Sequence, residues 1–270
     1  MIRTLPPRVV VGVDAAVVIG LTAAGLFASQ GWRAWYGALV ESFAIIATPV
    51  LGGAAVVTWV SERQVGRLQG ARRGSALVGR GARDTALAAW VAACLFAWPL
   101  ARMNAGQPTG LVWTVEEAGG PVALVLQNLG GLLVLDAWLY WKHRLLHTRL
   151  LFGFHRGHHV YRDPTPLAGF AVGPVESLLT FWPVLLVALP EAPHYGPVYL
   201  TLVVGFVLLN LYLHCGVAWR GLETLLRPLS INTSTHHNRH HANADTHFAE
   251  ALTVWDRLLG TREAAAARRA

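Results

Sequence analysis

The sequence predicts an all-α fold, in which about four to six polytopic transmembrane helices carry a helical, histidine-rich cap on the cytoplasmic side. Three observations favour this class. Of the 270 residues, 54% are hydrophobic and only 14% are charged. An average soluble domain has roughly 25% charged residues, so this composition is typical of a membrane protein. The mean hydropathy of +0.42 agrees. Ten of the twelve histidines also fall in three short clusters and one isolated position, close to apolar segments.

Six apolar segments approach the length of about 20 residues that crosses the hydrocarbon core of a bilayer. They cover residues 9–29, 37–60, 85–100, 119–141, 175–189 and 197–213. The first is expected to remain as a helix, since its apolar run is too long for the core of a signal peptide. Asp136 interrupts the fourth segment, and an acid within a span is expected to face the protein interior.

The positions of the arginines predict the orientation of these segments. The formal net charge is +7, and six arginines lie between the second and third segments with only two acids: Arg63, Arg67, Arg72, Arg73, Arg80 and Arg83. Arginine-rich loops face the cytoplasm, so counting the spans places every histidine cluster on the cytoplasmic face. No aromatic–basic interleaving accompanies the charge, and nucleic-acid binding is not predicted. The arginine-, alanine- and glycine-rich composition suggests a bacterial inner membrane.

The histidine clusters have the spacing of metal ligands on helices. They read His143-x-x-x-His147, His155-x-x-His158-His159 and His236-His237-x-x-His240-His241, with His214 standing alone. Residues three or four apart share a helix face, so each cluster can direct two or three imidazoles to one point. A buried imidazole needs a partner for its ring nitrogens. Because a single zinc uses three or four ligands, these ten histidines predict two metal ions. Imidazole suits iron, zinc, copper and nickel, so ligand type does not name the metal.

Several other residues are candidates for supporting roles. Asp136 and Glu176 are expected either to hold ligand imidazoles by hydrogen bonds or to be buried polar groups satisfied by the backbone. His236 either binds metal or orients a neighbour. Cys215 directly follows His214 and is a further candidate ligand, but a single cysteine is a weak signal.

Residues 136–261 resemble the fatty acid hydroxylase/sterol desaturase superfamily of integral membrane di-iron enzymes. The matching stretches are His143-Arg-Leu-Leu-His147, Phe154-His155-Arg-Gly-His158-His159, Pro174-Val-Glu176, His214, Thr235-His236-His237-Asn-Arg-His240-His241 and Leu252-Thr-Val-Trp255-Asp256-Arg-Leu-Leu-Gly260-Thr261. One departure is visible, because His247-Phe248-Ala249 replaces the Asn-Tyr-Gly that often precedes the last stretch. His247 is therefore either an added ligand or a surface replacement, and we favour the second.

The resemblance implies a cytoplasmic cap over a transmembrane stalk, and two iron ions that activate dioxygen. Zinc is expected to replace iron in some purified protein. Electrons would come from a separate electron-transfer protein, and the substrate would be a lipid from the bilayer, either a fatty acyl chain or sterol-like. The leading prediction is a lipid hydroxylase. A desaturase of the same family is the alternative, and a non-enzymatic membrane metal-binding or transport protein is the alternative of another class. The lipid, the oxidised carbon, the electron donor and the oligomeric state stay open.

Three regions follow from these motifs. Residues 1–118 are expected to form the N-terminal membrane helices and the arginine-rich loop, and residues 119–261 the di-metal catalytic domain. Residues 262–270 are expected to be a frayed tail.

Overall fold

Five helices form the body of the protein in the computed structural model, which describes residues 4–64, 67–69 and 76–262. Within these residues, five helices are long and apolar enough to cross a membrane. They are α1 (Pro7–Ala24), α2 (Trp32–Ser61), α3 (Ala76–Asn104), α4 (Pro121–Leu146) and α7 (Gly196–Leu213). The chain is therefore a helical, multi-pass integral membrane protein. Of the nine predicted tail residues only Arg262 is described, and Arg72 and Arg73 of the predicted loop also lie outside the described residues.

Two predicted spans differ from the structure. The segment 175–189 forms α6 (Pro174–Phe181) followed by the 3₁₀ helix η4 (Trp182–Ala188), which together are shorter than the five spans. The segment 85–100 belongs to a longer helix, because α3 begins nine residues before it and includes two arginines of the predicted loop. Arg80 lies on this helix four residues before Asp84 and pairs with its carboxylate at 3.3 Å.

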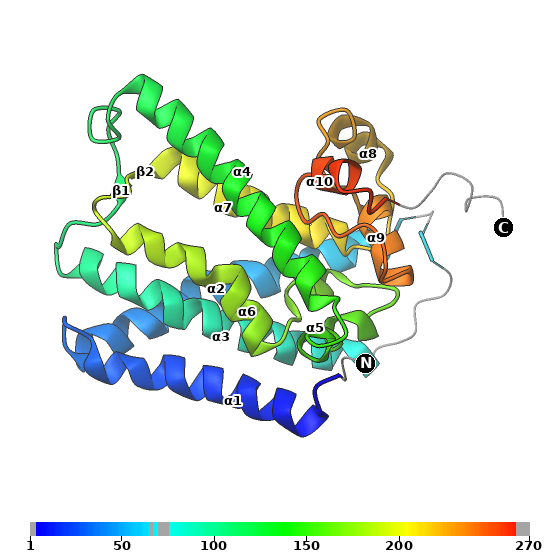
Figure 1. Cartoon of the computed structure of the whole chain (residues 1–270), viewed down its shortest axis with the longest axis horizontal. Helices are drawn as coiled ribbons and strands as arrows, with labels where there is room; N and C mark the ends of the chain where they lie inside the picture. Colours follow the sequence, from blue (N-terminus) through cyan, green and yellow to red (C-terminus); the bar gives the residue numbers. More distant parts are fainter. Residues whose placement is uncertain (1–3, 65–66, 70–75, 263–270) are drawn as a thin grey trace.

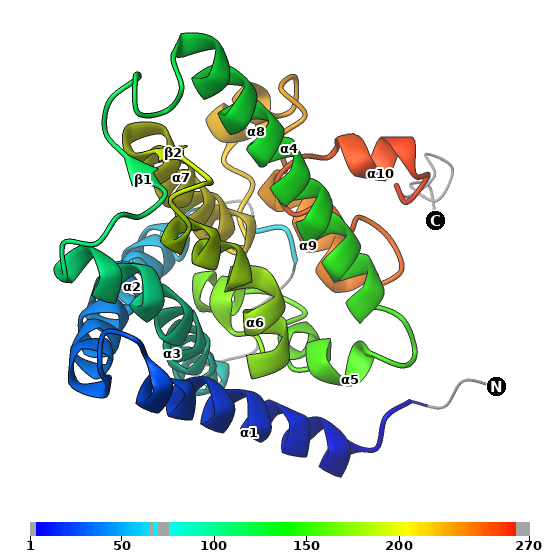
Figure 2. The same cartoon turned by 60° about the vertical axis from the view of Figure 1, so that its left-hand side comes forward.

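Short elements connect the long helices and build the cap. They are η1 (Gly25–Phe27), β1 (Leu111–Val112), α5 (Phe152–His155), η2 (His158–Val160), η3 (Pro166–Phe170), β2 (His194–Tyr195), α8 (Arg220–Leu226), α9 (Ser234–Ala242) and α10 (Val254–Leu258). The two-residue strands β1 and β2 pair in parallel at one end of the long helices. Figure 1 shows α5, α8, α9 and α10 at the opposite end, where α1 and α3 begin and α2, α4 and α7 finish. Figure 2 shows α6 between α2 and α3 on one side and α4 on the other.

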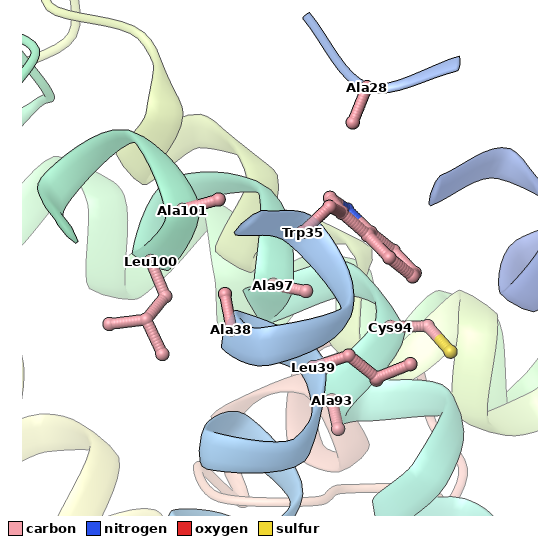
Figure 3. Close-up of a cluster of buried hydrophobic side chains, with 9 residues drawn as sticks. All are labelled: Ala28, Trp35, Ala38, Leu39, Ala93, Cys94, Ala97, Leu100 and Ala101. Carbon is pink, nitrogen blue, oxygen red and sulfur yellow. The ribbon is translucent and has the colours of Figure 1, made fainter. Parts of the chain in front are cut away.

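The packing of α2 against α3 uses one large aromatic residue and a row of small ones. Trp35 of α2 has no exposed surface and lies among alanines of α3, including Ala93 and Ala97 (Figure 3). Small residues let helix backbones approach closely, which is how helices gain contact energy inside a bilayer. The Trp35 ring also meets the edges of Tyr36 and Trp98, with ring centroids 5.0 and 5.7 Å away.

The outer faces of the long helices are apolar and exposed. Val11, Val122 and Val134 are 67%, 71% and 72% exposed. A band of exposed aliphatic side chains of this kind is expected to face lipid. Helix α3 is central, since 61% of its most apolar segment is buried, against 11% for α1 and for α4.

Buried carboxylates fix the C-terminal part of the cap to the helices. Asp136 of α4 accepts hydrogen bonds from the backbone N–H groups of Ala251 and Leu252, both at 3.2 Å, and from Trp255 Nε1 at 2.7 Å. A carboxylate with several N–H donors satisfies backbone groups that would otherwise be costly to bury. Asp136 therefore holds the segment before α10 against the membrane helix.

Candidate metal centre

Nine of the ten predicted ligands gather in two groups at the cap end of the helices. The first group contains His143, His147, His155, His159 and His240, and the second contains His158, His214, His237 and His241. Within each group, one nitrogen from every ring lies within 4.8 Å of the others. The chain folds this way because the end of α4, the α5–η2 turn, the end of α7 and helix α9 converge on one place.

The hydrogen bonds of the first group direct ring nitrogens inward. His143 Nδ1 lies 2.9 Å from the carbonyl oxygen of Phe248, and His240 Nδ1 lies 2.7 Å from that of Thr246. A carbonyl oxygen only accepts, so each Nδ1 carries the hydrogen and each Nε2 presents a lone pair. His143 Nε2 is buried without a hydrogen-bond partner among the described residues.

The inward-facing nitrogens of the first group carry too few hydrogens to form a hydrogen bond across each of their short contacts. His159 Nε2 lies 3.1, 3.0 and 3.2 Å from the Nε2 atoms of His147, His155 and His240. A single hydrogen on His159 Nε2 would satisfy only one of these three contacts. A cation at the centre would satisfy all of them, so the residues present fit a metal ion.

The second group has the same property. His214 Nδ1 donates to the carbonyl oxygen of Asn210 at 2.8 Å, which leaves its Nε2 as a lone pair 2.9 Å from His237 Nε2. Among the described residues, His158 Nδ1, His237 Nδ1 and both ring nitrogens of His241 are buried without partners. Buried polar atoms without partners are costly in a folded protein, and a second metal ion would bind one nitrogen of each of these rings.

The surroundings keep these imidazoles neutral. Burial, with the nearby positive charge of other histidines, lowers the pKa of His159 to about 4 and that of His240 to about 3. Burial also lowers the pKa of His214 to about 4. A neutral imidazole is the form that binds metal, so the unmetallated site already holds its ligands in the reactive protonation state near neutral pH.

A buried ionic network supports the first group. His155 Nδ1 lies 2.7 Å from Glu176 Oε2, and Lys142 Nζ lies 3.8 Å from Glu176 and 3.2 Å from Glu250. Glu250 also approaches His143 Nδ1 at 3.5 Å. Sequence reasoning missed Lys142 and Glu250. The signal for Lys142 was available, because it is the chain's single lysine and directly follows the predicted span 119–141.

Four other candidates lie outside the two groups. His236 Nε2 donates to Asp256 Oδ2 at 2.9 Å, and its ring belongs to neither group. His247 is 2% exposed and its Nδ1 lies 3.1 Å from His236 Nδ1, so the surface position we favoured is wrong. Cys215 Sγ donates to the carbonyl oxygen of Val217. In the part of the chain that is described, the bonds of Asp136 go to backbone and indole N–H groups rather than to a histidine.

A small cavity adjoins both groups on the side of the membrane helices. Its volume is about 30 Å³, and its lining includes His143, His158, Phe170, Phe181 and Phe206. A space of this size holds a water or another molecule of a few atoms. Its aromatic wall comes from η3, α6 and α7, and the ionic side chains Lys142, Glu176 and Glu250 also line it.

The fold and this site define a class of protein: a multi-pass helical membrane protein with two histidine-only groups at one end, each able to hold a metal ion. The sequence profile of the fatty acid hydroxylase family matches residues 129–261. The chain belongs to the fatty acid hydroxylase/sterol desaturase superfamily. No solved structure matches this chain.

Named relatives each match about half of the chain. Lathosterol oxidase of Rattus norvegicus is 35% identical over 146 residues, which are 53% of this chain and 46% of the relative. Delta(7)-sterol 5(6)-desaturase of Gibberella zeae is 30% identical over 131 residues, 48% of this chain and 36% of the relative. Methylsterol monooxygenase 1 of Rattus norvegicus is 29% identical over 150 residues, 49% of this chain and 45% of the relative. The match thus spans less than half the length of these relatives. All three relatives are eukaryotic proteins, so they do not support the bacterial origin that the composition suggested.

Proposed function

We propose that this protein is an iron- and dioxygen-dependent oxidoreductase that oxidises a C–H bond of a membrane lipid. The observation that carries the proposal is the pair of histidine groups, whose inward nitrogens lack enough hydrogens to satisfy one another. An unactivated C–H bond offers nothing to an acid, a base or a nucleophile. Two irons, when bound, would supply the redox chemistry with dioxygen that such a bond requires.

The residues of this chain would perform the remaining tasks. The nine histidines would hold the ions, and Glu176 would fix the orientation of the His155 ring through its Nδ1 hydrogen. The phenylalanines that line the small cavity would exclude water and receive an apolar carbon. Because the cavity is far smaller than a lipid, Phe181 or Phe206 would have to move when the substrate enters.

We propose hydroxylation as the reaction and a sterol-like or fatty acyl lipid as the substrate. Desaturation is the second candidate, favoured by the names of two relatives, an oxidase and a desaturase acting on sterols. Both reactions need two further electrons, which we assign to a separate electron-transfer protein. We also propose that residues 119–261 form the catalytic unit and that its histidine end faces the cytoplasm, as the arginine positions predict.

The first experiment measures metal content by mass spectrometry on protein purified in mild detergent without an affinity histidine tag. We expect about two irons per chain, with zinc in place of some iron after overexpression. His158→Ala and His240→Ala should each lose metal, because they remove a ligand from different groups. His236→Ala is the matched control and should retain both ions, since His236 lies in neither group.

Product mass then distinguishes the reactions. Iron-loaded protein with a reductant and candidate sterols should give a product heavier by one oxygen in the case of hydroxylation, or lighter by two hydrogens in the case of desaturation. A chain that binds no stoichiometric metal after anaerobic reconstitution with iron would contradict the proposal. Metal binding without turnover of any lipid would favour the non-enzymatic alternative.

A further inference from the structure

The residues His236, His247 and Asp256 form a third compact group beside the two metal-binding groups. Unlike those groups, it contains no buried nitrogen or oxygen without a partner. His236 Nε2 donates to Asp256 Oδ2 at 2.9 Å, and His247 Nδ1 lies 3.1 Å from His236 Nδ1 and 3.0 Å from His236 Nε2. Asp256 Oδ1 accepts from Phe248 N and from Thr261 Oγ1. Each of the three side chains therefore has its buried polar atoms in contact with a partner, and no metal ion is needed to satisfy them.

A pocket with strong positive charge opens next to this group. Its volume is about 170 Å³, and four of its lining residues are arginines: Arg227 after α8, Arg239 of α9, Arg257 of α10 and Arg262. His236 and Thr235 add further polar groups to the wall. Among the described residues that line it, there is no carboxylate. A cation in this pocket would be repelled, whereas an anion would meet several donors.

Only one of the four arginines has its charge balanced nearby. Arg227 donates to Glu223 Oε2 from Nη2 at 2.6 Å and from Nε at 3.0 Å. Across the residues that the structure describes, Arg239, Arg257 and Arg262 have no carboxylate within ion-pairing distance. Guanidinium groups bind phosphate oxygens through two parallel hydrogen bonds, and three of them around one space fit a phosphate group.

Exposed leucines lie close in sequence to two of these arginines. Leu225 and Leu229 flank Arg227 in the chain and are each 60% exposed, and Leu258 follows Arg257 and is 70% exposed. Leu225 lies on α8 and Leu258 on α10, and Figure 1 shows both helices in the cap, to one side of α4. Exposed leucines beside arginines at the end of a membrane span are typical of the boundary between headgroups and acyl chains.

We propose that this pocket binds the phosphate of an anionic phospholipid, with the surrounding leucines in contact with its acyl chains. The arginines would supply recognition of the headgroup, and the leucines would place the pocket at the depth where phosphates lie. No histidine of the two groups lines this pocket, so phospholipid binding there does not depend on the proposed function.

The test uses native mass spectrometry on the full-length protein in mild detergent, mixed with phosphatidylglycerol or phosphatidylcholine of identical acyl chains. Wild-type protein should retain phosphatidylglycerol several-fold more than phosphatidylcholine. The double variant Arg257→Gln/Arg262→Gln should lose most of this preference. The matched control Arg149→Gln/Arg156→Gln removes two exposed arginines at the same end of the molecule but outside the pocket, and should keep the preference.

A competition arm separates the sources of the phosphate. Excess inorganic phosphate should leave the bound lipid in place, because it lacks the acyl contacts. Displacement by inorganic phosphate would overturn the proposal in favour of a soluble phosphate compound. Equal retention of the two lipids, or equal loss in the control variant, would also overturn it. If the glutamine variant does not fold, Arg257→Lys/Arg262→Lys replaces it. That variant keeps the charge but loses the paired hydrogen bonds, and should still lose part of the preference.

Discussion

Glu176 shows how a single carboxylate can serve two partners at the metal centre. It is 2% exposed, accepts from His155 Nδ1 at 2.7 Å and lies 3.8 Å from Lys142 Nζ. A carboxylate that accepts the outer ring hydrogen fixes the tautomer of a metal-binding imidazole and strengthens its inner nitrogen as a ligand. Burial raises the pKa of Glu176 to about 8, and the nearby ammonium group of Lys142 opposes this rise by favouring the ionised carboxylate.

The variant Glu176→Gln tests this role. Glutamine keeps the size of the side chain and an oxygen that can accept from His155, but removes the charge. We expect metal affinity to fall roughly 10- to 100-fold, as for other partners of metal-bound histidines. The measurement is the loss of iron to a chelator over time. Glu41→Gln is the control, since Glu41 bonds to Asn104, at the end of α3 away from the histidines. Loss of iron at the wild-type rate from Glu176→Gln would contradict the assignment.

At the scale of the helices, close packing between small and aromatic residues holds the N-terminal spans together. A Cβ atom added at Gly25 would collide with the indole ring of Trp35. Trp35 is fully buried and lies against Tyr36 and Trp98, so its ring has little freedom to move. The glycine that follows α1 is therefore required by the packing of α2.

The pair Gly25→Ala and Gly12→Ala tests this packing. We expect Gly25→Ala to lower the free energy of unfolding by about 1–3 kcal/mol, the usual cost of overpacking a core. Gly12 lies on α1 with open space around it, so Gly12→Ala should not destabilise the protein. Thermal unfolding in detergent compares the two. Equal melting temperatures for both variants would show that the contact with Trp35 is not a constraint.

At the scale of the whole molecule, the long helices bring every histidine cluster to one end. Whether that end faces the cytoplasm is predicted from Arg63, Arg67, Arg80 and Arg83, which lie near the same end as the clusters. This orientation matters for function, because a separate electron donor would have to reach the cap.

Cysteine labelling tests the orientation. The native cysteines Cys94 and Cys215 are 1% and 0% exposed, so they should react slowly with a membrane-impermeant maleimide. A cysteine at exposed Arg149, on the histidine end, should label only when the cytoplasmic face is accessible. A cysteine at exposed Gln107, at the opposite end, should label only from the other side. The reverse pattern would place the metal centre outside.

The buried histidines also make the iron-free protein sensitive to acid. In the folded state the pKa is about 4 for His159 and His214, against an ordinary value of 6.5 that the unfolded chain would regain. Between these values the unfolded state binds more protons, so stability should fall as the pH drops from about 6.5 to 4 and should change little above 6.5. Thermal unfolding of chelator-treated protein at several pH values measures this. A melting temperature that is constant from pH 7 to pH 4.5 would contradict it.

The sequence by itself determined the membrane class and the family, and it predicted nine histidines that the structure brings together in two groups. These depend on local composition and spacing, such as His143 four residues before His147, which a helix converts directly into a shared face. For the same reason the span at 175–189 was overestimated, because apolar composition does not reveal where an α-helix changes into a 3₁₀ helix.

Only the tertiary structure divided the histidines into a group of five and a group of four, and separated His236 from both. His158 and His159 are neighbours in the chain but belong to different groups, because successive residues of the 3₁₀ helix η2 point about 120° apart. The structure also showed that Asp136 accepts hydrogen bonds from backbone N–H groups and that Lys142 lies between Glu176 and Glu250. It likewise showed that four arginines line one pocket. Each of these contacts joins residues far apart in sequence, and the packing of whole helices, rather than any local pattern, brings them together.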